Sequence, residues 1–256
     1  MGTARVRVPG LGHPLEAEVD EDGQQLLVGG RRLSVADAVF EAASTGLVYG
    51  VALNSHSGLD VLGAALSQPP YAAPPKAPVL YIKPWNTHVG HHARITLPQG
   101  AQEVEVLAAL GVVVGRETTR ATEARALEHV GGYTIAADLS LPATSFYRPP
   151  IREKCIDASC PIGPWVVARE RISDPDALAI EVEVDGRSAQ QFDLSDCVRK
   201  VPRLIADITA FMTLHPGDVL LAGVQVRGPR ARPGQSVAVR IDGIGTLAFS
   251  IAEAGA

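Results

Sequence analysis

The sequence predicts an α+β protein that consists mainly of β-strands. Short alternating or continuous apolar stretches recur along the chain, and most of them end at Gly, Pro or Asp turns. Beyond the first 45 residues, only two segments show helical character. Hydrophobic residues form 46% and charged residues 20% of the 256-residue chain, a mixture that is typical of a globular protein.

The first 45 residues predict a small β module. Apolar and polar residues alternate at 5–8 and 15–19, and turn signals follow at 20–23 and 29–30. This pattern indicates a β meander through residue 33. Ser34 is expected to cap a short helix that runs to Ala43, because its hydroxyl can accept from the first free amides. We therefore expect a β module at 1–45 and a larger domain at 46–256.

The larger domain is predicted to form mixed sheets with few helices. Strands are expected at 47–53, 79–82, 94–97, 105–114, 132–138, 164–169, 179–184, 218–222, 236–241 and 246–251. A first helix is expected over 122–130, ended by two glycines. A second is expected over 197–214, where an apolar stripe suits packing on a sheet.

Composition excludes several classes of function. With a formal net charge of −5 and 5% aromatic residues, the chain lacks the positive field and stacking rings of a nucleic-acid binder. No apolar stretch approaches the roughly 18 residues of a membrane span. Cys155, Cys160 and Cys197 cannot all pair within the chain and form no zinc spacing, so we expect a cytoplasmic protein.

Five charged residues are candidates for a binding site. Lys83 ends an apolar strand, where its ammonium group could neutralise an anion or simply reach solvent. Asp138 ends another strand and could bind a hard cation or cap a loop. Arg148, Arg152 and Lys154 lie within seven residues, in a segment that suits a di- or tricarboxylate but equally a solvated loop.

Several motifs, in order from about residue 46 onward, resemble the fumarylacetoacetate hydrolase family. They are I-K-P at 82–84, V-V-V-G at 112–115, A-R-A-L-E-H-V-G-G-Y at 124–133, K-C-I-D-A-S-C-P-I-G-P-W at 154–165 and L-H-P-G-D-V-L-L at 214–221. Segments 51–57, 70–76 and 140–149 further resemble the N-terminal half of the family's tandem isomerase/decarboxylases of homoprotocatechuate (4-hydroxyphenylacetate) degradation. The resemblance implies a mixed β roll with peripheral helices, which forms dimers. It also implies a Mg²⁺ or Mn²⁺ ion that polarises a 2-oxo acid.

The metal-binding pattern of the family is incomplete in this chain. The family binds its metal through two glutamates of an E-x-E strand motif and one aspartate, and Asp138 matches that aspartate. Counting back from Gly115, the glutamate positions fall on Leu107 and Ala109, which cannot bind a metal. Glu103 and Glu105 repeat the E-x-E spacing but lie four residues early, about 13 Å along a strand.

The proton-transfer pattern is also changed. The family's acid/base histidine and glutamate correspond to Gly58 and Val61, while His56 lies two residues early. The family's G-T-P motif reads G-V-Q at 223–225. Lys83 and Lys154 match family positions and remain as catalytic candidates. Together with Arg148 and Arg152, they are the expected substrate-binding set.

Three hypotheses about function remain open. In the first, the chain is a subunit of an isomerase/decarboxylase that acts on 5-oxopent-3-ene-1,2,5-tricarboxylate and 2-hydroxyhepta-2,4-dienedioate. Its own metal site is degenerate, and it forms a homodimer or a heteromer with a C-terminal-type subunit that is catalytically complete. In the second, it is an independent decarboxylase, isomerase or hydrolase of a 2-oxo dicarboxylate that uses His56 or Glu105 at new positions. In the third, it is a non-catalytic dicarboxylate binder.

Overall fold

A computed structural model describes residues 2–69, 73–142 and 150–252, and its architecture is two packed sheets with few helices. The larger sheet has the order β4-β3-β2-β1-β12-β11-β10-β15-β6-β7, and three short strands pair at its sides. Its strands are β1 (Gly2–Arg7), β2 (Leu15–Val19), β3 (Gln25–Val28), β4 (Arg31–Ser34), β5 (Val39–Phe40), β6 (Val48–Ala52), β7 (Val79–Lys83), β8 (His88–Val89), β10 (Val104–Val114), β11 (Val130–Ser140), β12 (Cys160–Ala168), β15 (Val219–Ala222) and β16 (Arg230–Ala231).

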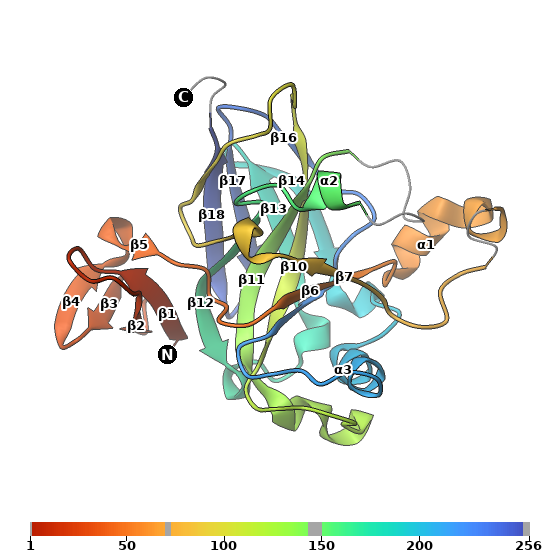
Figure 1. The fold of residues 1–256 in the computed structure, drawn as a ribbon, viewed down its shortest axis with the longest axis horizontal. Helices are drawn as coiled ribbons and strands as arrows, with labels where there is room; N and C mark the ends of the chain where they lie inside the picture. The colour runs from red at the N-terminus through yellow and green to blue at the C-terminus, as the bar shows by residue number, and fades with distance from the viewer. Residues whose placement is uncertain (1, 70–72, 143–149, 253–256) are drawn as a thin grey trace.

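The smaller sheet packs against the long central strands β10 and β11 (Figure 1). Its order is β14-β13-β17-β18-β9. The strands are β9 (Arg94–Ile95), β13 (Ala179–Val184), β14 (Arg187–Asp193), β17 (Ser236–Ile241) and β18 (Gly245–Ile251). The mainly β, α+β fold class predicted from the sequence is therefore confirmed.

Side chains alternate between the two faces of β10, which separates two apolar clusters. Val106, Ala108 and Leu110 join the main core, which continues into the smaller sheet. Leu107 and Ala109 point to the opposite face and join a second, smaller apolar cluster. Asp138 lies on this second face, opposite Leu107.

Helices are short and peripheral. They are α1 (His56–Leu62), α2 (Ile151–Lys154), α3 (Val201–Thr209) and the 3₁₀ turns η1 (Val35–Asp37), η2 (Gly63–Ser67), η3 (Trp85–Thr87), η4 (Glu123–His129), η5 (Arg169–Arg171), η6 (Pro175–Ala177) and η7 (Leu194–Asp196). None in the described part of the chain is both long and apolar enough to cross a membrane.

Three helix predictions need correction. Ser34 does cap a helical turn, but the turn ends at Asp37 because the chain continues as β5, which pairs with β1. The helix expected over 122–130 is the 3₁₀ helix η4. The helix expected over 197–214 is reduced to α3, since a separate 3₁₀ turn precedes it and Leu214 bridges to Thr118.

The N-terminal meander extends the larger sheet. β1 pairs with β12 through Gly2↔Val167 and Thr3↔Val166, and β1 to β4 form a lobe at one side of the molecule (Figure 1). Two strand predictions were incomplete: β12 begins at Cys160 rather than residue 164, and β14 was not expected. β14 escaped prediction because it is an edge strand whose residues are all partly or fully exposed. The division of the chain at residues 45 and 46 stays a prediction.

Candidate functional site

Asp138 lies on β11, on the face of the larger sheet that carries the second apolar cluster. In the antiparallel pair of β10 and β11, Leu107 lies directly opposite Asp138, and Ala109 lies opposite Ala136. Antiparallel neighbours on one face have Cβ atoms about 5 Å apart. The two glutamate positions of the family pattern therefore lie on the same face as Asp138, and they hold apolar side chains.

The carboxylate of Asp138 is held by three side chains, two of them predicted candidates. Lys83 Nζ lies 2.9 Å from Oδ1, and Lys154 Nζ lies 2.5 Å from Oδ2. The hydroxyl of Tyr81 donates a hydrogen bond of 2.6 Å to Oδ2. Asp138 and Lys83 are fully buried, and Lys154 is 6% exposed. We call these four residues the Asp138 cluster.

Local structure explains why the cluster assembles. Tyr81 and Lys83 are two residues apart on β7, so they share one face of the strand. Lys154 ends α2 and approaches from the other side, with its Nζ 4.8 Å from the centre of the Tyr81 ring. Lys83 also donates to Ser159 Oγ at 3.1 Å and to the Lys154 carbonyl. Tyr81 and Ser159 were missed from the sequence, although the spacing of Tyr81 from Lys83 was a usable signal.

The cluster fixes the protonation of its members. Burial alone raises the pKa of Asp138, but the ammonium groups of Lys154 and Lys83 outweigh it and lower the pKa to about 2. Burial and the neighbouring Asp138 carboxylate raise the pKa of Tyr81 well above its usual value. At neutral pH Asp138 is thus an acceptor and Tyr81 a donor, and neither is set to exchange a proton.

The residues around Asp138 do not fit a divalent metal ion. Leu107 and Ala109 are buried among apolar side chains, and Val224, the middle residue of the altered G-T-P motif, belongs to the same cluster. Mg²⁺ and Mn²⁺ need several hard oxygen ligands. Among residues 2–69, 73–142 and 150–252, no three His, Cys, Asp or Glu side chains are grouped to hold a metal. Asp138 is therefore the only residue of the family's expected ligand set that this chain retains.

Glu103 and Glu105 do not replace the missing ligands. Glu105 lies opposite Ser140, two pairs from Leu107 and Asp138, and it forms an ion pair with Arg227 at 3.8 Å. Glu103 forms ion pairs with Arg230 and Arg232. Both carboxylates thus pair with arginines of the segment that follows β15, and neither forms an ion pair with Lys83 or Lys154 among the described residues.

The two positions of the family's acid/base pair hold a glycine and a valine, which cannot transfer a proton. Gly58 is buried in α1, where an added Cβ would lie 2.5 Å from Ser55 Oγ and 2.6 Å from Val226 Cγ2. Val61 is 70% exposed, and His56 is also exposed. A histidine side chain at position 58 would have no room without movement of the segment that contains Val226.

The predicted substrate-binding set is only partly assembled. Lys83 and Lys154 meet at Asp138, whereas Arg152 is exposed on α2 and lines a surface pocket with Glu103 and Leu141. Arg148 lies outside the described residues. Of the predicted four, Lys83 and Lys154 therefore lie together, and the substrate-binding role of the set stays a prediction.

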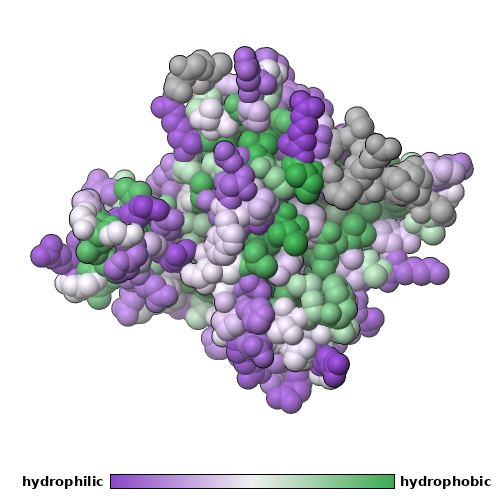
Figure 2. All heavy atoms as spheres, viewed as in Figure 1, coloured by the Kyte–Doolittle hydropathy of each residue, from purple (hydrophilic) through white to green (hydrophobic). Residues whose placement is uncertain are grey.

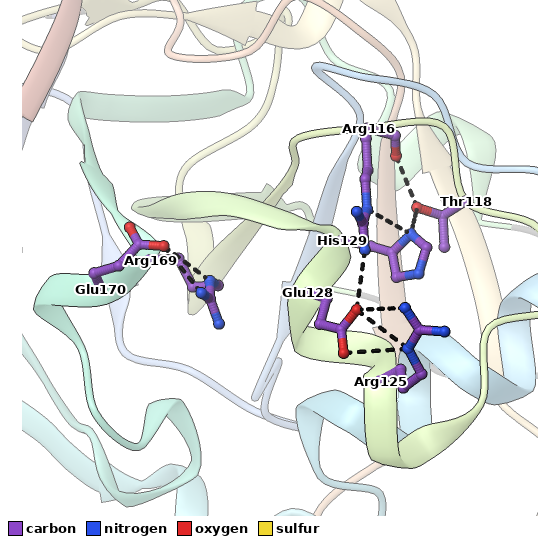
Figure 3. Close-up of polar contacts among 7 residues, drawn as sticks. All are labelled: Arg116, Thr118, Arg125, Glu128, His129, Arg169 and Glu170. Carbon is purple, nitrogen blue, oxygen red and sulfur yellow. Dashed lines mark hydrogen bonds and ion pairs between the residues drawn. The ribbon is translucent and has the colours of Figure 1, made fainter.

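A separate polar group lies on the surface around η4 (Figure 3). Arg125 and Arg116 contact the Glu128 carboxylate, and Arg116 and Thr118 contact His129 Nδ1. Arg125 is 70% exposed and Glu128 46%, so solvent screens these ion pairs. None of the candidate residues belongs to this surface network.

The sequence was compared with known proteins. Residues 47–252 match the profile described as fumarylacetoacetate (FAA) hydrolase C-terminal. The 4-hydroxyphenylacetate degradation bifunctional isomerase/decarboxylase of Salmonella dublin is 40% identical over 202 residues, which is 79% of this chain and 46% of that enzyme. The chain thus spans about half the length of this relative.

Solved structures show the same fold over the whole chain. The 5-carboxymethyl-2-hydroxymuconate delta-isomerase of Mycobacterium smegmatis superposes with a TM-score of 0.81 at 28% identity, covering 100% of both chains. Maleylpyruvate hydrolase of Sphingobium sp. SYK-6, solved with manganese(II) and pyruvate, gives a TM-score of 0.79 over 99% of each chain. At 20% identity, this second likeness shows the fold alone.

Proposed function

The chain belongs to the fumarylacetoacetate hydrolase family, and we propose that it is a non-catalytic subunit of an isomerase/decarboxylase, paired with a catalytically complete member of the family. The observation that carries the proposal is that buried apolar side chains occupy both glutamate positions: Leu107 lies opposite Asp138 and Ala109 opposite Ala136. The buried glycine at position 58 agrees with it.

The substrate class of the proposed complex is inferred from its relatives. The relative from Salmonella dublin is named for 4-hydroxyphenylacetate degradation, and the M. smegmatis structure for 5-carboxymethyl-2-hydroxymuconate. We therefore propose that the complex acts on 5-oxopent-3-ene-1,2,5-tricarboxylate and 2-hydroxyhepta-2,4-dienedioate. The metal that this chemistry needs would belong to the partner. Cys155, Cys160 and Cys197 are free thiols, so we extend the proposal to a reducing, cytoplasmic location.

The two other hypotheses receive less support. An independent enzyme would need an oxygen-rich metal site and a proton-transfer pair, and neither His56 nor Glu105 lies in contact with the Asp138 cluster through any hydrogen bond or ion pair in the described residues. A dicarboxylate binder would need free ammonium groups. Those of Lys83 and Lys154 already form ion pairs with Asp138.

The proposal predicts that the isolated chain has no metal-dependent turnover. Decarboxylation of 5-oxopent-3-ene-1,2,5-tricarboxylate should be slower by roughly 10⁴-fold or more than that of a metal-competent relative, because both the Lewis acid and the acid/base pair are missing. The measurement is CO₂ release in saturating Mg²⁺. The chain is assayed alone and after co-expression with a family member from the same genome that carries E-x-E and the His/Glu pair.

Two results would support the proposal together. The co-expressed proteins should elute as one complex in chromatography with light scattering, and replacing the partner's E-x-E glutamates by glutamine should abolish the rate of that complex. Mg²⁺-dependent CO₂ release by the purified chain alone would contradict the proposal and would favour an independent enzyme.

A further inference from the structure

We propose that Asp138, Lys83 and Lys154, without the two glutamates of the family pattern, form a permanent, metal-free ion cluster that joins β7, β11 and α2. The inference concerns the stability of the fold. It stands whether or not the chain has a catalytic partner, because it rests only on the residues that surround Asp138.

Contacts to both carboxylate oxygens are the first support. The ammonium group of Lys83 lies 2.9 Å from Oδ1, and that of Lys154 lies 2.5 Å from Oδ2, where Tyr81 also donates. A metal ion bound to either oxygen would lie beside an ammonium group, and Leu107 and Ala109 offer it no oxygen atom.

Charge is the second support. Two ammonium groups and one carboxylate leave the buried cluster with one excess positive charge. A divalent cation would enter against that charge in a region of low dielectric, where repulsion between like charges is strong. With the two glutamates of the family pattern, three carboxylates beside the same two ammonium groups would give a net charge of −1 instead. The charge at this position in the present chain is thus opposite in sign to the one a metal ion requires.

Connectivity is the third support, because the cluster links parts of the chain far apart in sequence. Lys83 also holds the segment after α2 through Ser159 Oγ and the Lys154 carbonyl. The amide of Leu141, just after β11, donates to the Glu153 carbonyl in α2 at 2.9 Å. α2 has only four residues and cannot hold its place by helical hydrogen bonds alone. The ion cluster therefore fixes α2 against the sheet.

Asp138→Asn tests the inference, since asparagine keeps the shape but removes the charge. It would leave two buried ammonium groups without a counter-ion, so the Tm should fall by roughly 10 °C or more. Lys154→Met should cost less, because the Lys83 and Asp138 pair remains. The double variant Asp138→Asn/Lys154→Met should have a higher Tm than Asp138→Asn, since one unpaired charge is gone. The wild-type Tm should be the same in EDTA and in millimolar Mn²⁺.

The opposite outcomes would overturn the inference. If Asp138 were a metal ligand awaiting its ion, Asp138→Asn would leave the Tm in EDTA unchanged or raise it, and Mn²⁺ would raise the Tm of the wild type but not of the variant. If Asp138→Asn yields no folded protein, the double variant decides. If the double variant Asp138→Asn/Lys154→Met folds, the role of Asp138 is electrostatic, as inferred. If the double variant does not fold although Lys154→Met alone does, the inference is contradicted. All of these measurements report folding and thermal stability, so they do not depend on catalytic activity.

Discussion

Replacing Leu107 and Ala109 together by glutamate should unfold the chain in EDTA and allow it to fold in Mn²⁺. Both positions are at most 4% exposed and lie among apolar side chains on the face of Asp138. Each buried, unpaired carboxylate costs several kcal/mol, and a domain has only about 5–15 kcal/mol of stability. With Mn²⁺, the two glutamates and Asp138 would provide three carboxylates around one ion and reverse the excess positive charge of the cluster.

Circular dichroism during thermal unfolding, with EDTA and with Mn²⁺, measures this effect. The matched control is Leu107→Gln/Ala109→Gln, which has the same shape without charge and should show no response to Mn²⁺. Adding Asp138→Asn to the glutamate pair should weaken the response by removing the third ligand. A double glutamate variant whose unfolding is the same with and without Mn²⁺ would show that these two positions alone do not explain the missing metal site.

Acid should destabilise the protein through His91, beginning well above the pKa values of ordinary carboxylates. His91 is 8% exposed, its Nδ1 accepts a hydrogen bond of 3.0 Å from the Ala248 amide, and its ring meets that of Phe40 edge-on at 5.0 Å. Burial, with a smaller contribution from the charge of His92, lowers the pKa of His91 to about 3. A protonated ring would lose the bond from Ala248, because its Nδ1 could no longer accept.

The sign of the pH effect is set by the pKa of His91 in the two states. The unfolded chain binds a proton at His91 near pH 6.5, and the folded chain does so only near pH 3. The free energy of unfolding is therefore unaffected by His91 above about pH 6.5 and falls as the pH drops toward 3. Between pH 7 and pH 4.5 the loss should be about 2 to 3 kcal/mol, since each pH unit costs about 1.4 kcal/mol.

Urea unfolding of His91→Asn at both pH values isolates this contribution. Asparagine places an acceptor oxygen near the position of Nδ1 and does not titrate, so the variant should lose about 2 to 3 kcal/mol less than the wild type on acidification. His92→Asn is the control, because His92 is the exposed neighbour. Equal acid sensitivity of His91→Asn and the wild type would remove His91 as the cause.

Strands were predicted from the sequence more reliably than helices, for a physical reason. Apolar runs bounded by glycine, proline or aspartate define β10, β11, β13, β17 and β18 closely, because these strands are buried on at least one face. The length of a helical turn depends more on contacts between segments that are distant in sequence. β5 ends the turn capped by Ser34, and its pairing with β1 is a contact that local spacing does not contain.

Three of the four residues of the Asp138 cluster were candidates from the sequence, but their arrangement was not predicted. The resemblance to the family identified Lys83, Asp138 and Lys154 and placed Leu107 and Ala109 at the missing ligand positions. It did not predict that the two ammonium groups would both contact Asp138, since Lys83 and Lys154 are distant in sequence and meet only through the sheet order. Arg152 shares the charge of Lys154, but as a neighbour in α2 it points elsewhere.

An exposed apolar surface beside the Asp138 cluster suggests why a partner would matter. Apolar side chains gather near the middle of the view in Figure 2, over β6 and β7, with hydrophilic lobes around them. Ile82, Trp85 and Ile151, each more than half exposed, come from β7, η3 and α2, the elements next to the Asp138 cluster. A subunit contact near this face is consistent with the proposed function.

The most direct test of the account is a calorimetric titration of the metal-stripped wild-type chain with Mn²⁺, in the presence of oxalate as a bidentate mimic of a 2-oxo acid. Because Asp138 is already neutralised and Leu107 and Ala109 cannot bind a metal, we expect no binding at this site. Stoichiometric binding with a Kd tighter than about 100 μM would contradict the account, since that affinity requires a set of ligands completed by other residues of the chain.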